Sequence, residues 1–265
     1  MTTHTDLSQR PAVARGILLA ATASGSAEPL VRPCTAGLAI FVKTPGHSPL
    51  KTRLAAAIGD ASAMAFHRHA ALTVAAVARA AQIATPGLHV CWAVAEQSAL
   101  DDPLWSNLSR IAQGDGTLGA RMRRVCEALR DTYGCALLLG ADAPQITIAD
   151  IQAALHALDS HDHVLGPSAD GGFWLFGTRI AVPDAAWEHT PWSQSDTAAR
   201  FMQALGSSRI AQLRTLRDAD TVHDLAPLLT TLQLLRDPLP EQTALADWLR
   251  GNVLNDVRMV HAITE

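Results

Sequence analysis

Cysteine is scarce in this sequence, and its four copies follow no spacing typical of a metal site or a disulfide framework. Cys34, Cys91, Cys126 and Cys135 form no C-x-x-C pair and have no histidine at zinc-finger distance. Cys91 and Cys135 lie in apolar runs, where cysteine behaves as a small hydrophobic residue. We therefore expect reduced, buried thiols and a cytoplasmic protein.

Long apolar runs and an excess of positive charge are also missing. No apolar stretch approaches the ~18 residues that span a membrane. Residues 15–27 imitate a signal peptide only loosely, because the apolar part, Ile17 to Ala21, is shorter than the ~7–15 residues such a region needs. The net charge of -4 argues against binding of nucleic acid by bulk electrostatics. We expect neither a membrane nor a nucleic acid as partner.

What the sequence does have is an alternation of short apolar runs and longer periodic segments. The apolar runs predict strands at 36–43, 88–94, 136–140, 163–165, 173–176 and 210–216. The periodic segments predict helices at 60–84, 118–133, 147–158, 190–205, 222–235 and 241–253. This alternation indicates an α/β fold, a three-layer α/β/α sandwich with a mostly parallel central sheet.

No internal repeat or low-complexity linker divides the chain. We expect residues 1–35 to form an N-terminal extension, residues 36–235 one domain, and residues 236–265 a helical C-terminal segment. That segment follows the helix-breaking Pro238 and Pro240. It would pack either on its own domain or on a second subunit, in a homodimer.

The residues that follow each predicted strand are the candidates for chemistry, because ligands of open α/β sheets bind beyond the carboxyl ends of the strands. The loop VKTPGHSPLKTRLA follows the first strand and carries Lys43, Lys51 and Arg53. Lys51 and Arg53 approach a helix N-terminus, which favours an anion. The loop contains neither a Walker A motif nor G-x-G-x-x-G. It is either a local anion site or a set of solvated surface cations.

Acidic residues follow the later strands. Asp142, in GADAP, could ligate Mg²⁺ or Mn²⁺ or cap the turn before the next helix. The sequence Asp170-Gly171-Gly172 either lets the backbone approach a ligand closely or forms a plain turn. Asp218 and Asp220, in LRDADT, are weaker candidates because they could cap the following helix.

A Gly-rich stretch adds a weaker candidate for phosphate binding. The sequence QGDGTLGARM runs from Gln113 to Met122 and leads into a predicted helix. Gly116 lies in its loop, and Arg121 lies in the first turn of the helix.

Taken in order, these stretches resemble the GT-A-like nucleotide-diphospho-sugar transferases, in the branch described as arsenosugar-biosynthesis glycosyltransferases or as a domain of unknown function. The matching segments lie at 43–54, 116–122, 140–144, 165–177, 191–193 and 216–225. The resemblance implies a GT-A fold, a nucleotide-activated donor and a divalent cation, Mg²⁺ or Mn²⁺.

The resemblance also implies roles for single residues. Lys43, Lys51 and Arg53 would face the donor phosphates, and Asp142 would be a metal ligand. Asp170 would lie near the acceptor or the reacting carbon. A second metal or substrate contact would come from Asp218 or Asp220.

Three functions remain open on these residues. The first is glycosyl transfer from a nucleotide sugar to a small acceptor, in which Asp170 would act as general base if the anomeric centre inverts. The second is nucleotidyl transfer, in which a phosphorylated small molecule attacks an NTP and pyrophosphate leaves. The third is a nucleotide-binding module without catalysis, because alanines stand at 141, 143 and 169, where the family has polar or acidic residues.

Overall fold

The sheet is the centre of this computed structural model, which describes residues 35–254. In that part of the chain, seven strands have the order β3-β2-β1-β4-β6-β5-β7. Neighbouring strands are parallel except at β6, which is antiparallel to both β4 and β5. The predicted mostly parallel sheet is confirmed. The strands are β1 (Ala36–Val42), β2 (Leu88–Val94), β3 (Ser109–Ala112), β4 (Cys135–Gly140), β5 (His163–Pro167), β6 (Phe173–Thr178) and β7 (Ile210–Gln212).

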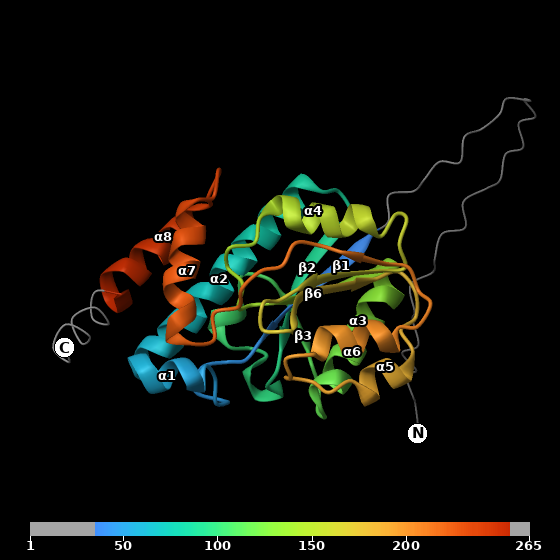
Figure 1. Cartoon of the computed structure of the whole chain (residues 1–265), viewed down its shortest axis with the longest axis horizontal. Coiled ribbons are helices and arrows are strands. Elements are labelled where there is room, and N and C mark those ends of the chain that lie inside the picture. The colour runs from blue at the N-terminus through green and yellow to red at the C-terminus, as the bar shows by residue number, and fades with distance from the viewer. Residues whose placement is uncertain (1–34, 255–265) are drawn as a thin grey trace, which may run out of the picture. The chain divides into compact units, whose positions relative to one another are not determined.

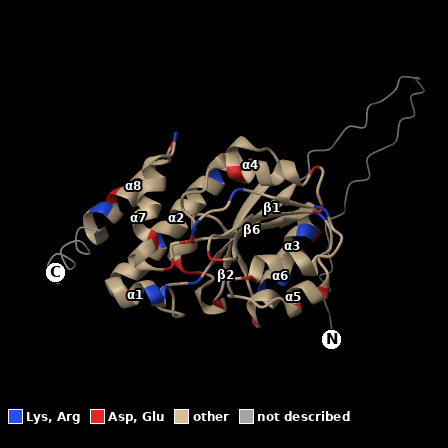
Figure 2. Cartoon of the chain, viewed as in Figure 1, with Lys and Arg blue, Asp and Glu red and all other residues tan. Residues whose placement is uncertain are grey.

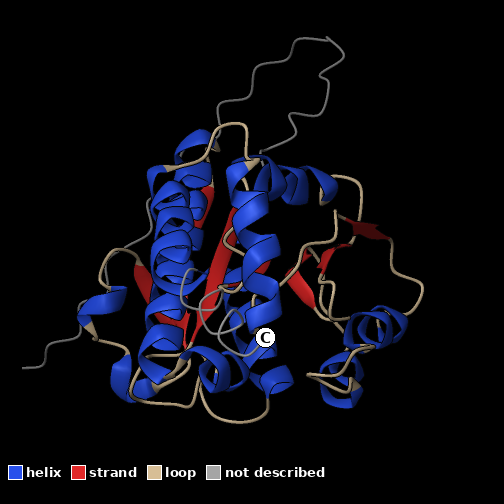
Figure 3. Cartoon of the chain, turned by 60° about the vertical axis from the view of Figure 1, so that its left-hand side comes forward, coloured by secondary structure: helices blue, strands red, loops and turns tan. Residues whose placement is uncertain are grey.

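Helices cover both faces of the sheet (Figures 1 and 3). They are α1 (Thr52–Ile58), α2 (Asp60–Ala84), α3 (Leu118–Tyr133), α4 (Ile148–Ala157), α5 (Asp184–His189), α6 (Thr197–Ala204), α7 (Val222–Gln233) and α8 (Pro240–Leu249). On one face, α2 and α4 pack on Ile40 and Leu137. On the other face, α3, α5 and α6 pack on Ala39 and Leu138. The predicted three-layer α/β/α sandwich is confirmed.

The C-terminal segment packs on the same domain through a third apolar cluster. Leu245 and Leu249 of α8 join Phe66 of α2 and Leu228 of α7 there. Gln242 of α8 is 3% exposed and donates to the backbone carbonyls of residues 144 and 146, at 3.0 and 2.9 Å. These bonds fix the loop that follows β4. The segment therefore supports the edge of the sheet at which a ligand is expected.

The helix predicted at 190–205 and the strand predicted at 210–216 are much shorter in the structure. The helix predicted at 190–205 is correct only over α6, because Pro191 cannot continue a helix and Ser193 has a φ of 62°. The strand predicted at 210–216 ends at Gln212; beyond it, Leu213 donates to Leu165 O at 2.9 Å and Leu216 forms an isolated bridge with Ser168. The short strand β3 and the helices α1 and α5 were not predicted.

His163 is a fully buried polar residue at the start of β5, the strand next to the edge strand β7. Its Nδ1 lies 2.9 Å from Thr178 Oγ1, and that hydroxyl donates to Ile180 O at 2.8 Å. The Thr178 proton is therefore engaged, so His163 Nδ1 carries the proton and Nε2 is left without a partner in the described part of the chain. Burial lowers the pKa of His163, and the nearby Asp162 does not offset it.

The cysteines follow the expectation only in part. Cys91 and Cys126 are free thiols, and burial raises their pKa to about 11 and about 12. Cys135 is disulfide-bonded, so the expectation of a reduced thiol is wrong at this residue. In residues 35–254, no helix has the length and apolar character that a membrane span requires. The stretch that imitates a signal peptide lies outside the described residues, as do residues 255–265.

Candidate functional site

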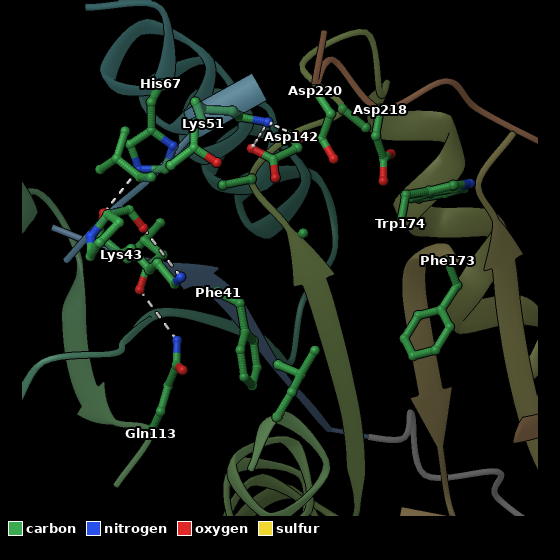
Figure 4. Close-up of a pocket in the computed structure, with 18 residues that line it drawn as sticks. Phe41, Lys43, Lys51, His67, Gln113, Asp142, Phe173, Trp174, Asp218 and Asp220 are labelled. Carbon is green, nitrogen blue, oxygen red and sulfur yellow. Dashed lines mark hydrogen bonds and ion pairs between the residues drawn. The ribbon is translucent and has the colours of Figure 1, made fainter. Parts of the chain in front are cut away.

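A cavity of about 450 Å³ opens beyond the carboxyl ends of β1 and β4. These strands bring Lys43 and Asp142 to its wall. Phe173 and Trp174 join them from β6, because an antiparallel strand begins at the edge where its parallel neighbours end. Acidic residues gather in the loops between α2 and β6 (Figure 2). Figure 4 shows the side chains that line the cavity.

Lys51 joins two loops at this edge of the sheet. Its Nζ lies 2.9 Å from Asp142 Oδ1 and 2.6 Å from Asp220 Oδ1, and it donates to Ala219 O at 2.7 Å. The Lys51 side chain is 4% exposed. Burial opposes its charge, but the two carboxylates outweigh burial and raise the pKa of Lys51. Lys51 Nζ thus donates two hydrogen bonds, to Ala219 and Asp220, and forms an ion pair with Asp142, whose Oδ1 accepts no hydrogen bond in the described part of the chain.

Lys51 has a left-handed backbone conformation, which is rare for residues other than glycine. Lys51 precedes α1 and has φ 48° and ψ 37°, in the left-handed region, which costs roughly 1–2 kcal/mol for a non-glycine residue. Its carbonyl accepts the N–H of Ala55 at 2.8 Å, which starts α1, and Leu54 in the first turn is buried. This backbone conformation places the Lys51 side chain beside Asp142 and Asp220.

Asp218 lies beside this ion triad. Its Oδ1 accepts a hydrogen bond from Ser168 Oγ at 3.0 Å. Burial, and then the neighbouring carboxylates of Asp142, Asp170 and Asp220, raise the pKa of Asp218 to about 7. By contrast, Lys51 outweighs burial at Asp142 and lowers its pKa. The edge thus holds more carboxylate than ammonium charge, which favours a further cation.

The donor set fits a divalent cation that is shared with a substrate. Aspartate oxygens suit Mg²⁺ and Mn²⁺, and Mg²⁺ usually takes one or two carboxylates and completes its shell with water and phosphate oxygens. Asp142 and Asp218 both line the cavity. Within residues 35–254, no group of three or more His, Cys, Asp or Glu side chains is arranged to hold a metal ion by itself. A closed protein cage is therefore not the kind of site that these residues form.

Lys43 and His67 form the opposite wall of the cavity. Lys43 Nζ donates to Pro49 O at 3.4 Å and engages no other group in the described part of the chain, so it keeps donors for a ligand. His67 Nε2 lies 2.9 Å from Lys43 O. Because a carbonyl only accepts, Nε2 carries the proton and Nδ1 is an acceptor. Burial lowers the pKa of His67 and favours this neutral form. Lys43 is thus better placed than Lys51 to meet an anion.

Thr44 holds the loop after β1 in shape without the glycines of a Walker A motif. It is 1% exposed, its N–H donates to Glu96 Oε2 at 2.9 Å, and its Oγ1 accepts from Trp105 Nε1 at 2.9 Å. Gly46 takes a φ of 87°, which a glycine adopts freely. The loop path therefore depends on side chains from the segment after β2.

Several predicted residues lie outside the lining of the cavity. Arg53 is exposed on α1, and Arg121 donates from Nε to Gly116 O at 3.1 Å in the first turn of α3. Asp170 is exposed, and its Oδ1 accepts the N–H of Gly172 at 2.9 Å. The structure brings together Lys43, Lys51, Asp142, Asp218 and Asp220 around the cavity. It leaves Arg53, Gly116, Arg121, Asp170, Gly171 and Gly172 outside its lining.

Close packing joins three of the sequence motifs into one unit. A Cβ on Gly171, which has a φ of 89°, would lie 1.7 Å from Ser195 O. A Cβ on Gly119 would lie 2.2 Å from Trp187 O and 2.4 Å from Trp192 Nε1. Gly119 of the motif G-x-L-G and Gly171 of the motif D-G-G therefore leave no room for a side chain beside residues 187–195, which include P-W-S. This packing holds the Asp170 turn close to Asp218.

Sequence reasoning missed three residues that complete the surroundings. Ser168, His67 and Gln113 are all buried, and the last two line the cavity. A signal existed for His67, because it is a polar residue on the buried face of an alanine-rich helix. Gln113 is the first residue of the QGDG stretch, in which only Gly116 was predicted to bind a ligand. Nothing local marked Ser168.

The fold is that of a nucleotide-diphospho-sugar transferase-like α/β protein. Residues 73–194 match a family model described as an uncharacterized protein conserved in bacteria (DUF2064). The chain is also similar to the crystal structure of a proposed nucleotide-diphospho-sugar transferase from Desulfovibrio desulfuricans G20. The identity is 26% and the TM-score 0.67, over 80% of this chain and 95% of that chain. The GT-A-like resemblance indicated by the motifs is confirmed.

Two further solved structures are similar at lower scores. One is the homologue of Rv0371c from Mycobacterium sp. strain JC1, at 15% identity and a TM-score of 0.44, over 75% of this chain and 98% of that chain. The other is 4-diphosphocytidyl-2C-methyl-D-erythritol synthase from Anaerococcus prevotii, at 11% identity and a TM-score of 0.47, over 75% and 96%. A comparison with curated proteins found no match.

Proposed function

We propose that this protein is a metal-dependent transferase that uses a nucleotide-activated donor and moves a sugar from a nucleotide sugar to a small acceptor. The observation that supports the proposal is that Lys43, Asp142 and Asp218 line one cavity at the carboxyl edge of the sheet. Such an arrangement suits a diphosphate and its divalent cation. The name of the Desulfovibrio relative, which covers most of both chains, supports sugar transfer.

In the proposed reaction, a nucleoside diphosphate leaves and its negative charge grows as the bond to the sugar breaks. A bound Mg²⁺ or Mn²⁺ would neutralise part of this charge, with Asp142 and Asp218 as its ligands. Lys43 would hold the phosphates from the other wall. Lys51 lowers the pKa of Asp142 and so keeps that carboxylate ionised, and it is ion-paired with Asp220 as well. It would meet a phosphate by exchanging one of these contacts.

The acceptor would bind at the β6 side of the cavity. Phe173 and Trp174 line the cavity there, directly after the Asp170 turn. Asp170 is proposed as the base that takes the proton of the acceptor if the anomeric centre inverts. Arg53 and Arg121, which lie outside the cavity, would steer anions toward it and contact them at most at its rim.

The experiment identifies the phosphorus product. The protein is incubated with Mg²⁺ or Mn²⁺, a panel of nucleotide sugars and NTPs, and small acceptors. The phosphorus-containing products are identified by ³¹P NMR. Release of nucleoside diphosphate from a nucleotide sugar supports the proposal. Release of pyrophosphate from an NTP contradicts sugar transfer and supports nucleotidyl transfer, which would use the same cations.

Two further outcomes separate the remaining alternatives. A rise in melting temperature with nucleotide and metal, in the absence of any turnover, supports a non-catalytic nucleotide-binding module. Failure of every nucleotide to bind or to stabilise the protein contradicts all three functions.

A further inference from the structure

Gln113 is a buried polar residue to which the proposed chemistry gives no role. It follows β3 directly and is 4% exposed. It lines the cavity on the side of Phe41 and Lys43, away from Asp218 (Figure 4). A polar side chain this deeply buried is expected to have partners for each of its polar atoms.

Hydrogen bonds fix the orientation of the Gln113 amide. Nε2 donates to Val42 O at 3.3 Å and to Ala93 O at 2.8 Å. Because carbonyl oxygens only accept, both amide hydrogens face these carbonyls, and this decides which terminal atom is the nitrogen. The backbone is fixed as well, since the Gln113 N–H donates to Val94 O at 2.9 Å and its carbonyl accepts from Arg124 Nη1. The side chain therefore offers Oε1, an acceptor, and no donor.

Oε1 of Gln113 accepts no hydrogen bond from residues 35–254. The same end of the cavity carries apolar surface, from the half-buried Phe41 and from Leu118, which is 42% exposed. A flat apolar group with an N–H on its edge matches both features. A nucleobase is such a group.

We propose that Gln113 Oε1 accepts a hydrogen bond from an N–H on the Watson–Crick edge of the donor nucleobase, and that Gln113 is a specificity-determining residue for the donor. This inference rests on the proposed function, because it takes the ligand to be a nucleotide whose phosphates face Lys43. The orientation of the amide is set by β1 and β2 before any ligand arrives, so the acceptor is preorganised.

The test compares nucleotides that differ only at the base. UDP, CDP, GDP and ADP are titrated calorimetrically into the wild-type protein with Mg²⁺. The tightest binder is then compared with its analogue methylated at the base N–H groups: 3-methyl-UDP, N4,N4-dimethyl-CDP, 1,N2,N2-trimethyl-GDP or N6,N6-dimethyl-ADP. We expect the methylated analogue to bind at least about 10-fold more weakly, because it leaves Oε1 unpaired. The 2′-deoxy analogue is the control for the ribose and should change Kd by less than about 3-fold.

The outcomes separate this inference from the proposed function. Equal affinity for the parent and the methylated base overturns the inference alone, whereas failure of all four diphosphates to bind overturns the proposed function as well. Gln113→Met, which keeps the side-chain length without the oxygen, should shrink the methylation penalty to less than about 3-fold. If methylation weakens binding to the folded variant as much as to the wild type, the size of the methyl groups alone explains the loss of affinity, and the inference is overturned. If the variant does not fold, the wild-type comparison decides.

Discussion

Lys51→Met keeps the length of the side chain and removes its ammonium. In the wild-type protein this ammonium lies 2.9 Å from Asp142 and 2.6 Å from Asp220 in a side chain that is 4% exposed. Removing one partner of a fully buried ion pair costs about 3–5 kcal/mol. The two carboxylates are 39% and 46% exposed, so water can solvate them in part. We expect the free energy of unfolding at pH 7 to fall by about 1–3 kcal/mol.

The pH dependence of this loss follows from the pKa of Asp142, which Lys51 lowers in the folded state. A carboxylate with a lowered pKa stabilises the fold above its unfolded value of about 3.9, and this contribution disappears as the pH falls through the folded value. The difference between wild type and Lys51→Met should therefore be largest near pH 7 and should shrink as the pH falls below about 4, toward the lowered folded value of Asp142. Urea denaturation followed by tryptophan fluorescence at several pH values measures it.

Arg53→Met is the matched control, because Arg53 lies two residues further on and is exposed outside the cavity lining. Its free energy of unfolding should stay within about 0.5 kcal/mol of wild type. A Lys51→Met variant as stable as wild type at pH 7, or an equal loss in both variants, would refute the assignment of Lys51 as the counter-ion of the two carboxylates.

Three further predictions concern the metal, a glycine and acid stability. Asp142→Ala should remove metal-dependent nucleotide binding in calorimetry and leave the circular dichroism spectrum unchanged; unchanged binding contradicts the metal assignment. Gly171→Ala places a Cβ 1.7 Å from Ser195 O and should cost about 3 kcal/mol or more in urea unfolding, whereas Gly206→Ala, with no atom within 4 Å, should cost about 1–2 kcal/mol. Because burial lowers the pKa of His163, the unfolded state binds its proton more readily, so the free energy of unfolding should fall as the pH drops below about 6.5. The fall should be less steep in His163→Gln, and an equal dependence on pH in the variant and the wild type would contradict this prediction.

Local patterns predicted the elements whose stability is local. The helices at 60–84 and 118–133 and the strand at 88–94 have the predicted bounds, because periodicity and caps such as Thr117 and Gly134 are visible in the sequence. The strand β3 was missed because its four residues include an exposed Ser109 and Arg110, and it depends on pairing with β2. Ser193 interrupts the predicted helix at 190–205 with a φ of 62°, in the loop that packs on Gly171.

Candidate residues were predicted wherever a strand end marked them. Asp142, Asp218 and Asp220 follow strands or lead into a helix, and the structure places all three at the cavity. Arg53 and Asp170 met the same criterion, but their side chains lie outside the cavity lining, because position after a strand does not determine side-chain direction. The roles of these residues stay predictions.

The sequence by itself determined the α/β class, the carboxyl edge of the sheet as the place of the cavity, and five of the charged residues that line it: Lys43, Lys51, Asp142, Asp218 and Asp220. These properties follow from the local order of apolar and polar residues, which encodes which face of each element is buried. Only the tertiary structure decided that Lys51 of the loop after β1 is bound to Asp142 and Asp220, and that β1 and β2 orient the Gln113 amide. Ion pairs and buried hydrogen bonds depend on the order of strands in the sheet and on exclusion of water, which no local pattern contains.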